Sequence, residues 1–396
     1  MLAIQILLAV YAAAACAYWL WIARAMWLVR RRVPRLVDAH PPDPTRWPRL
    51  SVIIPACNEA DRIEPAARTL LAEDYPDLEL VFVDDRSDDA TGAIIDLLAA
   101  GDPRVKAIHI RELPDGWLGK VHALHCGFAE SSGEFVLLTD ADIHFERGSL
   151  RKAVAYAAWE RLDHLAALPE LLPTAIFLDA MILMFLRQFM AAVRPWAVSD
   201  PRSSAYIGIG AFNLVRREAF AATEGFEWLR METSDDMGVG LLMKTSGKRC
   251  GVVGARGYLS LQWYRTLGEA ARGAERAWST VLRFSLVRTA VLTLVSLLIQ
   301  GSPVLTLVPL AWADLRPIGC AGLAVTAAFL ASALLLRHWG RGGLWLRAMA
   351  SPLVAPVAAF ALMRAGWLGW RRGGAMWRGT VYPNELLRAG ARVKFP

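Results

Sequence analysis

Four short clusters of acidic and amide side chains have the residue types of a site that binds phosphate and a divalent metal ion. The clusters are Asn58-Glu59, Asp84-Asp85, Asp140-Ala141-Asp142 and Asp235-Asp236. Any one of them alone could cap a helix or form a turn, because Asp and Asn side chains accept backbone hydrogen bonds. Taken together, they indicate one shared site.

The acidic turn at residues 140–142 carries the most specific chemistry. It directly follows the apolar run Phe135–Leu138, where ionised carboxylates are costly unless a cation neutralises them. Carboxylate oxygens are ligands that Mg²⁺ and Mn²⁺ prefer, and phosphate oxygens can complete the coordination shell. We therefore expect a divalent metal, Mg²⁺ or Mn²⁺, that bridges the protein and a diphosphate leaving group.

The segments that must position these clusters alternate between strand-like and helix-like patterns from residue 50 to about residue 258. Strands are predicted at Leu50–Pro55, Leu78–Val83, Val105–Ile110 and Phe135–Thr139. Helices are predicted around Ile63–Leu71, Thr91–Ala99 and Val121–Ala129. This alternation predicts an α/β domain with a mainly parallel sheet that helices cover on both faces. Ligands bind at the carboxyl ends of such strands, where polar clusters follow three of the four.

The composition indicates a membrane protein with a water-soluble middle part. Of the 396 residues, 55% are hydrophobic and 20% are charged. Residues 2–22 carry no charge, and a helix of that length can cross a bilayer. The arginines from Arg24 to Arg35 follow this apolar run rather than precede it. We therefore expect a retained anchor, with the next segment in the cytosol, and no cleaved signal peptide.

Charge and cysteine patterns argue against several other classes. The middle part has no basic stripe interleaved with aromatic residues, so we expect no nucleic-acid partner despite the net charge of +7. The five cysteines show no paired spacing and are typical of a reducing compartment. His122, His125 and Cys126 have helical spacing and no second cysteine pair, so we interpret them as ordinary helix residues.

The chain divides into regions of different character. They are an N-terminal transmembrane anchor (1–29), a basic Pro-rich linker (30–49), a cytosolic catalytic domain (50–283), C-terminal membrane segments (284–370) and a basic tail (371–396). Thr289–Ala313 and Ile318–Leu336 can span a bilayer, whereas the Pro-containing Ala348–Met363 is either a third or a re-entrant segment. The basic tail is expected in the cytosol. Ile176–Val193 contains two charges, so we expect a buried or membrane-surface helix.

A series of motifs resembles the inverting family 2 glycosyltransferases in order and spacing. The motifs are Pro55–Asp61, Val83–Asp89, Gly119-Lys120, Thr139–Asp142, Gly210–Asn213 and Asp235-Asp236, across roughly residues 50 to 265. The resemblance implies a GT-A fold, that is, a Rossmann-like α/β catalytic domain flanked by transmembrane helices. The flanking segments, and Leu113–Lys120, resemble the lipid-glycosylating branch, which includes ceramide glucosyltransferases and hopanoid- or carotenoid-associated enzymes.

The resemblance implies a nucleotide-sugar site at the first clusters. The residues that would contact the donor are Pro55, Asn58, Glu59, Asp84, Asp85, Lys120, Asp140 and Arg265. Either Asp85 or Asp84 would accept a hydrogen bond from a uracil nitrogen, and Lys120 would stabilise the nucleotide or diphosphate. Asp142 would bind the metal most directly, with Asp140 as a second ligand near the ribose or sugar.

The resemblance also implies a catalytic and an acceptor side. Asp236 would be the general base that takes the acceptor's proton, while Asp235 replaces the family's usual Glu in a positioning role. Gly210, Ala211, Phe212 and Trp263 would lie on the acceptor side. The segment 262–266 resembles the Gln-x-x-Arg-Trp motif of processive enzymes, but Thr266 replaces its final Trp.

The function implied is transfer of one sugar from a nucleotide-sugar, with UDP as the expected nucleotide, to a hydroxyl of a membrane lipid. The partners expected are the donor, the lipid acceptor and the bilayer. The protein is expected in a bacterial plasma membrane with its catalytic domain facing the cytosol. The alternatives are a processive polysaccharide synthase and a non-catalytic lipid-glycan transport or scaffold protein.

Overall fold

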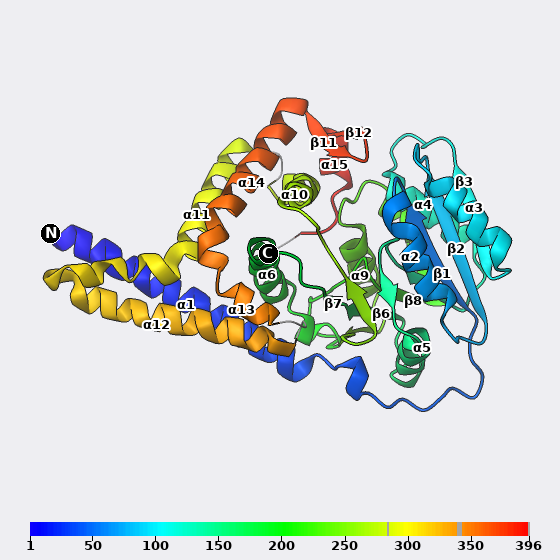
Figure 1. Ribbon diagram of the computed structural model, residues 1–396, viewed down its shortest axis with the longest axis horizontal. Coiled ribbons are helices and arrows are strands. Elements are labelled where there is room, and N and C mark those ends of the chain that lie inside the picture. Colours follow the sequence, from blue (N-terminus) through cyan, green and yellow to red (C-terminus); the bar gives the residue numbers. More distant parts are fainter. Residues whose placement is uncertain (283–284, 339–342, 395–396) are drawn as a thin grey trace.

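A seven-stranded mixed sheet forms the centre of the catalytic domain expected from the sequence, which is the catalytic part of the chain (Figure 1). The computed structural model describes residues 1–282, 285–338 and 343–394. The strands, in spatial order, are β3 (Val105–Ile110), β2 (Leu78–Asp85), β1 (Leu50–Ala56), β4 (Phe135–Leu138), β8 (Asn213–Arg216), β6 (His164–Leu168) and β9 (Cys250–Gly254). Only β8 runs antiparallel to its neighbours. The predicted α/β fold with a mainly parallel sheet is therefore confirmed.

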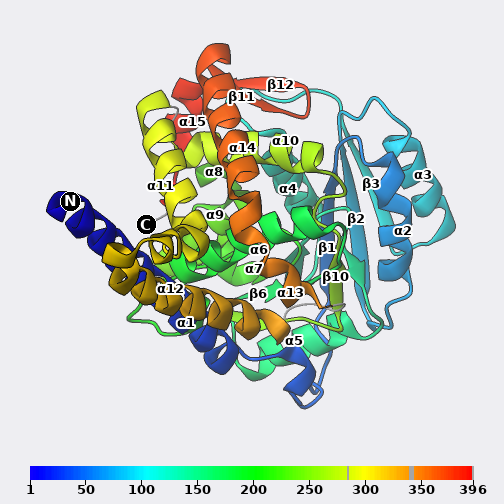
Figure 2. The same ribbon diagram turned by 60° about the vertical axis from the view of Figure 1, so that its left-hand side comes forward.

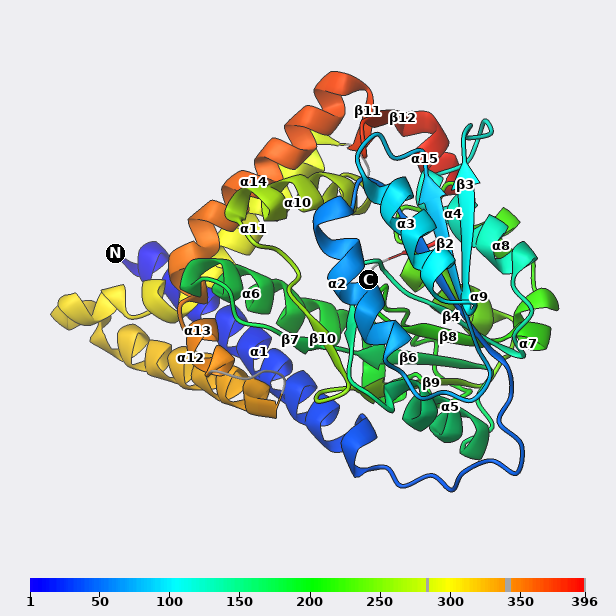
Figure 3. The ribbon, with the colours of Figure 1, turned by 45° about the vertical axis from the view of Figure 1, so that its right-hand side comes forward.

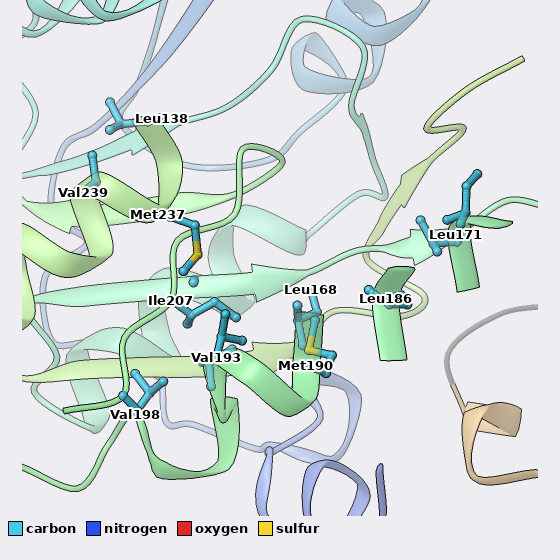
Figure 4. Packing of buried hydrophobic residues seen from close by; sticks show 14 of the residues in the cluster. Leu138, Leu168, Leu171, Leu186, Met190, Val193, Val198, Ile207, Met237 and Val239 are labelled. Carbon is cyan, nitrogen blue, oxygen red and sulfur yellow. The ribbon is translucent and has the colours of Figure 1, made fainter. Parts of the chain in front are cut away.

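Helices cover both faces of this sheet because side chains of a strand point alternately to its two faces. On β1, Val52 and Ile54 belong to one hydrophobic cluster and Ile53 to another. The first cluster includes residues of α2 (Ala60–Leu71), α3 (Thr91–Gly101) and α5 (Ser149–Trp159), and the second includes residues of α4 (Gly119–Glu130), α6 (Ile176–Val193) and α9 (Asp235–Thr245). Figure 4 shows part of the second cluster, where Met190 and Val193 of α6 lie beside Ile207.

Short elements complete the catalytic part and the connections around it. They are β5 (His144–Phe145), β7 (Glu170–Leu171), β10 (Leu259–Leu261), α7 (Arg217–Ala221), α8 (Gly225–Trp228), α10 (Leu267–Val281), α13 (Leu344–Ala348), β11 (Gly374–Trp377), β12 (Thr380–Pro383), α15 (Asn384–Gly390) and the 3-10 turns Leu36–Asp38, Pro195–Ala197, Val308–Ala311, Ala313–Leu315 and Leu335–His338. Strand β10 pairs with β5 and β7 and carries the chain to the loop at 262–266.

Five helices of the described residues are long and apolar enough to cross a membrane. They are α1 (Leu2–Arg32), α6 with its following turn, α11 (Leu286–Leu305) with its following turn, α12 (Arg316–Leu334) with its flanking turns, and α14 (Ser351–Arg372). Figures 1 and 2 show α1 beside α12, and α11 beside α14. Large apolar side chains, such as Leu7 and Phe360, are exposed on these helices. Such faces are compatible with a membrane protein.

Both charged side chains of α6 have partners within the protein. Arg187 is 1% exposed, donates to the hydroxyls of Ser332 (3.1 Å) and Ser351 (2.5 Å), and stacks on Trp19. Asp179 pairs with Arg347 of α13. These contacts favour a helix buried in the protein, although its composition also qualifies it as a candidate span.

Three sequence-based boundaries can be compared with the structure. The Pro-containing segment Ala348–Met363 begins at the end of α13, and its residues 351–363 lie in the continuous helix α14. The boundary expected between residues 283 and 284 lies outside the described residues, as do the last two residues of the expected tail. The motif Gly210–Asn213 spans a third boundary, because residues 208–212 form a loop and turn and β8 begins at Asn213.

Candidate functional site

A small cavity lies where the end of β4 meets the first turns of α4 and α9. Its lining residues are Lys120, Leu124, Leu138, Thr139, Asp140, Gly210, Asn213, Asp235, Asp236 and Val239. Residues that are far apart in the sequence meet here because strand ends and helix starts share one edge of the sheet. The structure thus brings together Lys120, Asp140, Gly210 and the Asp235-Asp236 pair, as predicted.

Lys120 connects two of the acidic clusters. Its Nζ lies 2.7 Å from Oδ1 of Asp140 and 3.0 Å from Oδ2 of the buried Asp235. Burial lowers the pKa of the Lys120 ammonium, but Asp140, Asp235 and Asp236 together raise it above its usual value. Lys120 is therefore a permanent cation between carboxylates and not a solvated lysine at a helix end.

Gly210 connects Asp140 with Asp236. Its backbone N–H donates to Oδ2 of Asp236 (2.9 Å), and its carbonyl accepts from the N–H of Asp140 (3.0 Å). A Cβ at residue 210 would lie 2.6 Å from Oδ2 of Asp140, so the approach requires glycine. Burial and the neighbouring Asp235 raise the pKa of Asp236, while Lys120 opposes this effect. Asp236 is thus a carboxylate whose affinity for a proton is increased.

Asp142 is held by an arginine from the first turn of α2. Nη1 of Arg62 lies 3.2 Å from Oδ2 of Asp142, and Nη2 lies 3.2 Å from Glu269 of α10. Burial, Asp140 and Glu59 raise the pKa of Asp142 to about 6, against the lowering effect of Arg62. The carboxylate is therefore in surroundings that favour an additional cation.

The two acids of the 140–142 turn fit a divalent metal only in combination with oxygens from a bound phosphate. Among the described residues there is no group of three or more His, Cys, Asp or Glu side chains that could hold a metal ion. Asp140 and Asp142 supply hard oxygen ligands, and a cation would stabilise the ionised form of Asp142, whose pKa is raised by burial and then by Asp140 and Glu59. The donor set is that of a metal shared with a substrate, not of a closed structural site.

The second strand places its two acids differently. Asp84 is buried, and its carboxylate lies 3.1 Å from Nδ1 of His109 and accepts from the N–H of Ser87 (3.2 Å). Asp85 accepts two bonds from the Arg86 side chain, at 2.8 and 3.2 Å. A Cβ at Gly119, next to Lys120, would lie 2.2 Å from Oδ2 of Asp85. Asp85 is buried as well, between Arg86 and the start of α4, whereas Asp84 lies against His109.

The loop after β1 is tied to the loop after β2. Asn58 has a left-handed backbone (φ 55°), donates from its N–H to Oγ of Ser87 (3.1 Å), and accepts through Oδ1 from the N–H of Asp88 (3.0 Å). The N–H of Glu59 donates to Oγ1 of Thr91 (2.8 Å). Pro55 is buried within β1. Asn58 therefore shapes the wall of the site. Glu59 takes part in these contacts through its backbone and not through its side chain.

Several predicted residues lie apart from this cavity. The side chains of Ala211 and Phe212 are 3% and 1% exposed and belong to the core, because they follow the turn directly into β8. Trp263 stacks on Tyr264 and lines a second cavity between α6 and α13. The side chain of Arg265 is exposed, and its backbone N–H donates to Glu269 (2.8 Å). Arg265 is thus connected to Asp142 only through Glu269 and Arg62.

Sequence reasoning missed several site residues. Arg62 follows Glu59 by three positions in one helix, a spacing that places both near the same end of the sheet and could have indicated it. Glu269, Arg378 and Tyr382 carry no local pattern that connects them to the acidic clusters. His122 and His125 pack against Trp117, in agreement with their interpretation as ordinary helix residues.

Comparisons with known proteins agree with this arrangement. Residues 51–179 match the model of Glycosyl transferase family 2. Probable glycosyltransferase YdaM of Bacillus subtilis (strain 168) is 37% identical over 24% of this chain and 23% of its own length. Beta-monoglucosyldiacylglycerol synthase of Synechocystis sp. (strain ATCC 27184 / PCC 6803 / Kazusa) is 29% identical over 36% of this chain and 32% of its own length. The alignments thus span about a quarter to a third of these relatives.

A solved structure extends the likeness in fold to the whole chain. The mannosyltransferase PcManGT from Pyrobaculum calidifontis, solved in complex with GDP-Man and Mn²⁺, superposes with a TM-score of 0.53 at 20% identity. The match covers 93% of this chain and 98% of that one. The comparisons support an enzyme of the glycosyltransferase class. Residues 51–179 therefore carry a Glycosyl transferase family 2 domain, within an α/β GT-A fold flanked by long apolar helices.

Proposed function

We propose that the protein transfers a sugar from a nucleotide-sugar, with UDP as the expected nucleotide, to a hydroxyl of a membrane lipid, with inversion at the anomeric carbon. The observation that carries this proposal is the cavity in which Lys120 lies between Asp140 and Asp235, with Asp236 beside them. Such a site holds a negatively charged leaving group and a proton acceptor close together. The family 2 match of residues 51–179 supports the reaction class.

Asp236 is the proposed general base. The acceptor oxygen attacks the anomeric carbon, its proton passes to Asp236, and the bond between that carbon and the diphosphate breaks. The raised pKa of Asp236 suits this task, because a carboxylate with greater proton affinity is a better base. The N–H of Gly210 holds Oδ2 of Asp236 in place.

The diphosphate side of the site is proposed to rest on Lys120, Asp140 and Asp142. A divalent metal held by Asp142 and Asp140 would neutralise the leaving diphosphate, and the bound Mn²⁺ of the PcManGT complex supports this assignment. Lys120 pairs with Asp140 and Asp235 and compensates their charge. Arg62 orients Asp142 through the ion pair at 3.2 Å.

The lipid acceptor is supported by the helices around the catalytic part. A bilayer around α1, α11 and α12 would allow an amphiphilic acceptor to diffuse laterally to the site. Beta-monoglucosyldiacylglycerol synthase, which matches 36% of the chain, is named for a lipid product. Trp263 lies at an apolar cavity beside α6 and is the proposed contact of the acceptor's apolar part.

The test uses the purified full chain in detergent, a panel of UDP- and GDP-sugars, Mn²⁺ and a membrane lipid extract. We expect one nucleotide-sugar to yield lipid products heavier by a single sugar, measured by mass spectrometry, with an inverted anomeric configuration in NMR spectra. Absence of transfer to any lipid would contradict the acceptor assignment. A ladder of added sugars would instead support a processive polymerase.

A further inference from the structure

The C-terminal segment Gly374–Lys394 returns to the donor side of the catalytic part after the last long helix. Strands β11 and β12 form a hairpin, and α15 follows it. Figure 3 shows the hairpin and α15 following the last long helix, α14, and a hydrogen bond joins β12 to the start of α4, more than 240 residues earlier in the chain. None of these residues lies in the part that matches the family model.

The hairpin contacts the loops that form the proposed donor site. Arg378, at its tip, forms an ion pair with Glu59. Oη of Tyr382 accepts a hydrogen bond from the N–H of Gly119 (3.3 Å) at the start of α4. Together with Asp85, Tyr382 also contributes to the raised pKa of the Arg86 guanidinium. The hairpin thus contacts the ends of β1, β2 and the helix that carries Lys120.

The remainder of the segment is held firmly against the loop that precedes the catalytic acids. Oε2 of the buried Glu232 accepts from the N–H groups of Arg392 (2.6 Å) and Val393 (2.9 Å). Leu387 of α15 is 1% exposed. Gly390 lies so close to Met231 that a Cβ at residue 390 would be 2.2 Å from its Cβ. The hairpin is therefore part of a built interface and not a loose tail.

The backbone at the hairpin tip is unusual. Arg378 has a left-handed conformation (φ 47°) and precedes Gly379 (φ 81°). Two-residue hairpin turns of this kind favour Asn or Asp followed by Gly, and a long side chain is unfavourable at the first position. The ion pair with Glu59 compensates for this unfavourable backbone conformation. The presence of arginine at residue 378 is therefore explained by the contact of its guanidinium and not by the turn.

Arg378 also lies within the negative surroundings of the nucleotide side. Burial and Asp85 raise the pKa of the half-buried Cys57 thiol, whereas Arg378 and Arg86 lower it, so these groups surround the same corner. Glu59 in turn acts on the pKa of Asp142 at the proposed metal position. Arg378 and its partner Glu59 therefore lie close to charged groups of both the proposed nucleotide side and the proposed metal position.

We propose that Arg378 is a donor-binding residue, oriented by Glu59 to bind the diphosphate of the nucleotide-sugar, and that the β11–β12 hairpin forms the outer wall of the donor site. A guanidinium suits this role because its N–H groups match phosphate oxygens in pairs. Tyr382 positions the hairpin on the start of α4. This inference rests on the proposed function, since it assumes a nucleotide-sugar donor.

The experiment compares binding of UDP and of uridine, which lacks phosphates, to the purified full chain at constant Mn²⁺. Calorimetry measures UDP, and ligand-observed NMR measures uridine. We expect Arg378→Ala to weaken UDP binding by about tenfold, the size expected of one charge-assisted contact, and to leave uridine binding unchanged. The UDP affinity of Arg378→Lys should fall between those of wild type and Arg378→Ala. Arg371→Ala, which removes the same charge at the end of α14, should leave both affinities unchanged.

Thermal unfolding of each variant separates binding from folding. Unchanged UDP affinity in Arg378→Ala would overturn the inference, and so would an equal weakening of UDP and uridine, which would indicate a purely structural hairpin. Wild-type protein that binds neither UDP nor GDP with Mn²⁺ would overturn the proposed donor as well. If the wild-type protein binds GDP more tightly than UDP, the same comparison uses GDP and guanosine in place of UDP and uridine.

Discussion

Charge compensation organises the candidate site at the scale of single residues. Lys120 serves Asp140 and Asp235, and Arg62 serves Asp142 and Glu269, so each cation is shared between two carboxylates. Sharing leaves each acid only partly neutralised. The remaining negative charge can be balanced by a metal ion, which can in turn bind a negatively charged donor.

The first prediction concerns the general base. Asp236→Asn preserves the side-chain shape but cannot accept the proton, so sugar transfer should fall by about 10²- to 10⁴-fold. Binding of UDP with Mn²⁺ should stay within about threefold of wild type, since the change lies on the acceptor side. Turnover and calorimetry measure the two quantities. Asp43→Asn in the exposed linker is the control, and near-normal turnover of Asp236→Asn would refute the base assignment.

The second prediction concerns the metal. Asp142→Ala removes the acid with the raised pKa of about 6 and leaves Arg62 with Glu269 alone. The factor by which Mn²⁺ increases the affinity for UDP should then be at least about tenfold smaller than in wild type, because one of the two proposed protein ligands is lost. A titration of Mn²⁺ at fixed UDP, followed by electron paramagnetic resonance, measures this. An unchanged Mn²⁺ dependence would exclude Asp142 as a ligand.

The third prediction concerns stability and pH. Burial lowers the pKa of His164 to about 4, and its Nε2 lies 2.6 Å from Oδ1 of Asn213. In the unfolded chain a histidine binds a proton below about pH 6.5, whereas the folded His164 stays neutral down to about pH 4. Its contribution to stability is thus present above pH 6.5 and is lost as the pH falls, by about 2 kcal/mol at pH 5.

The measurement for His164 is the free energy of unfolding of the solubilised chain between pH 7.5 and pH 5. His164→Gln keeps a polar partner for Asn213 but does not titrate, so its stability should fall less steeply than that of wild type over this range. Identical pH dependences of the two proteins would contradict the assigned pKa.

At the scale of elements, backbone-to-backbone packing holds the proposed catalytic acids, Asp235 and Asp236. The loop before β8 crosses α9 so closely that a Cβ at Gly208 would lie 1.7 Å from the carbonyl oxygen of Asp236. A Cβ at Gly240 of α9 would lie 2.1 Å from the carbonyl oxygen of Ile207. The glycines therefore allow α9 and the loop to place Asp236 beside Gly210.

The fourth prediction tests this packing. Gly208→Ala should force the loop away from α9 and destabilise the protein by on the order of 1–3 kcal/mol, with loss of transfer activity. Gly101→Ala is the matched control, because nothing lies within 4 Å of its added Cβ at the end of α3. Thermal unfolding measures both variants. Equal midpoints for Gly208→Ala and wild type would show that the crossing tolerates a methyl group.

At the scale of the whole molecule, long helices connect the catalytic part to an apolar surface. Glu275 of α10 pairs with Arg364 and Arg372 of α14, and Arg187 of α6 bonds to Ser332 of α12. These contacts join the catalytic part to the apolar helices through buried polar groups, which are costly to separate. The catalytic part is thereby held next to the proposed membrane.

The fifth prediction concerns membrane integration. The exposed apolar faces of α1, α11 and α14 should keep the full chain in the membrane pellet after alkaline carbonate extraction, and detergent should release it. Immunoblotting of the pellet and supernatant measures the distribution. Release by carbonate alone would indicate a surface-bound protein and would contradict the predicted spans.

Much of the catalytic part could be predicted from the sequence. The strands β1 to β4 begin where expected and end within two residues of the prediction, because strands buried on both faces are continuous apolar runs. Asp140, Lys120 and Asp236 lie together for a related reason, since polar residues at strand ends and helix starts gather at one edge of a parallel sheet.

What only the tertiary structure decided depends on contacts between distant elements. No local pattern connects Arg378 with Glu59, or Glu269 with Arg62, because these pairs form through the packing of separate helices and hairpins. The different surroundings of Asp84 and Asp85 likewise depend on His109 and Gly119, which neighbouring elements supply. Local sequence determines which strands form and where their polar ends lie, but which side chains meet at those ends is determined by long-range packing.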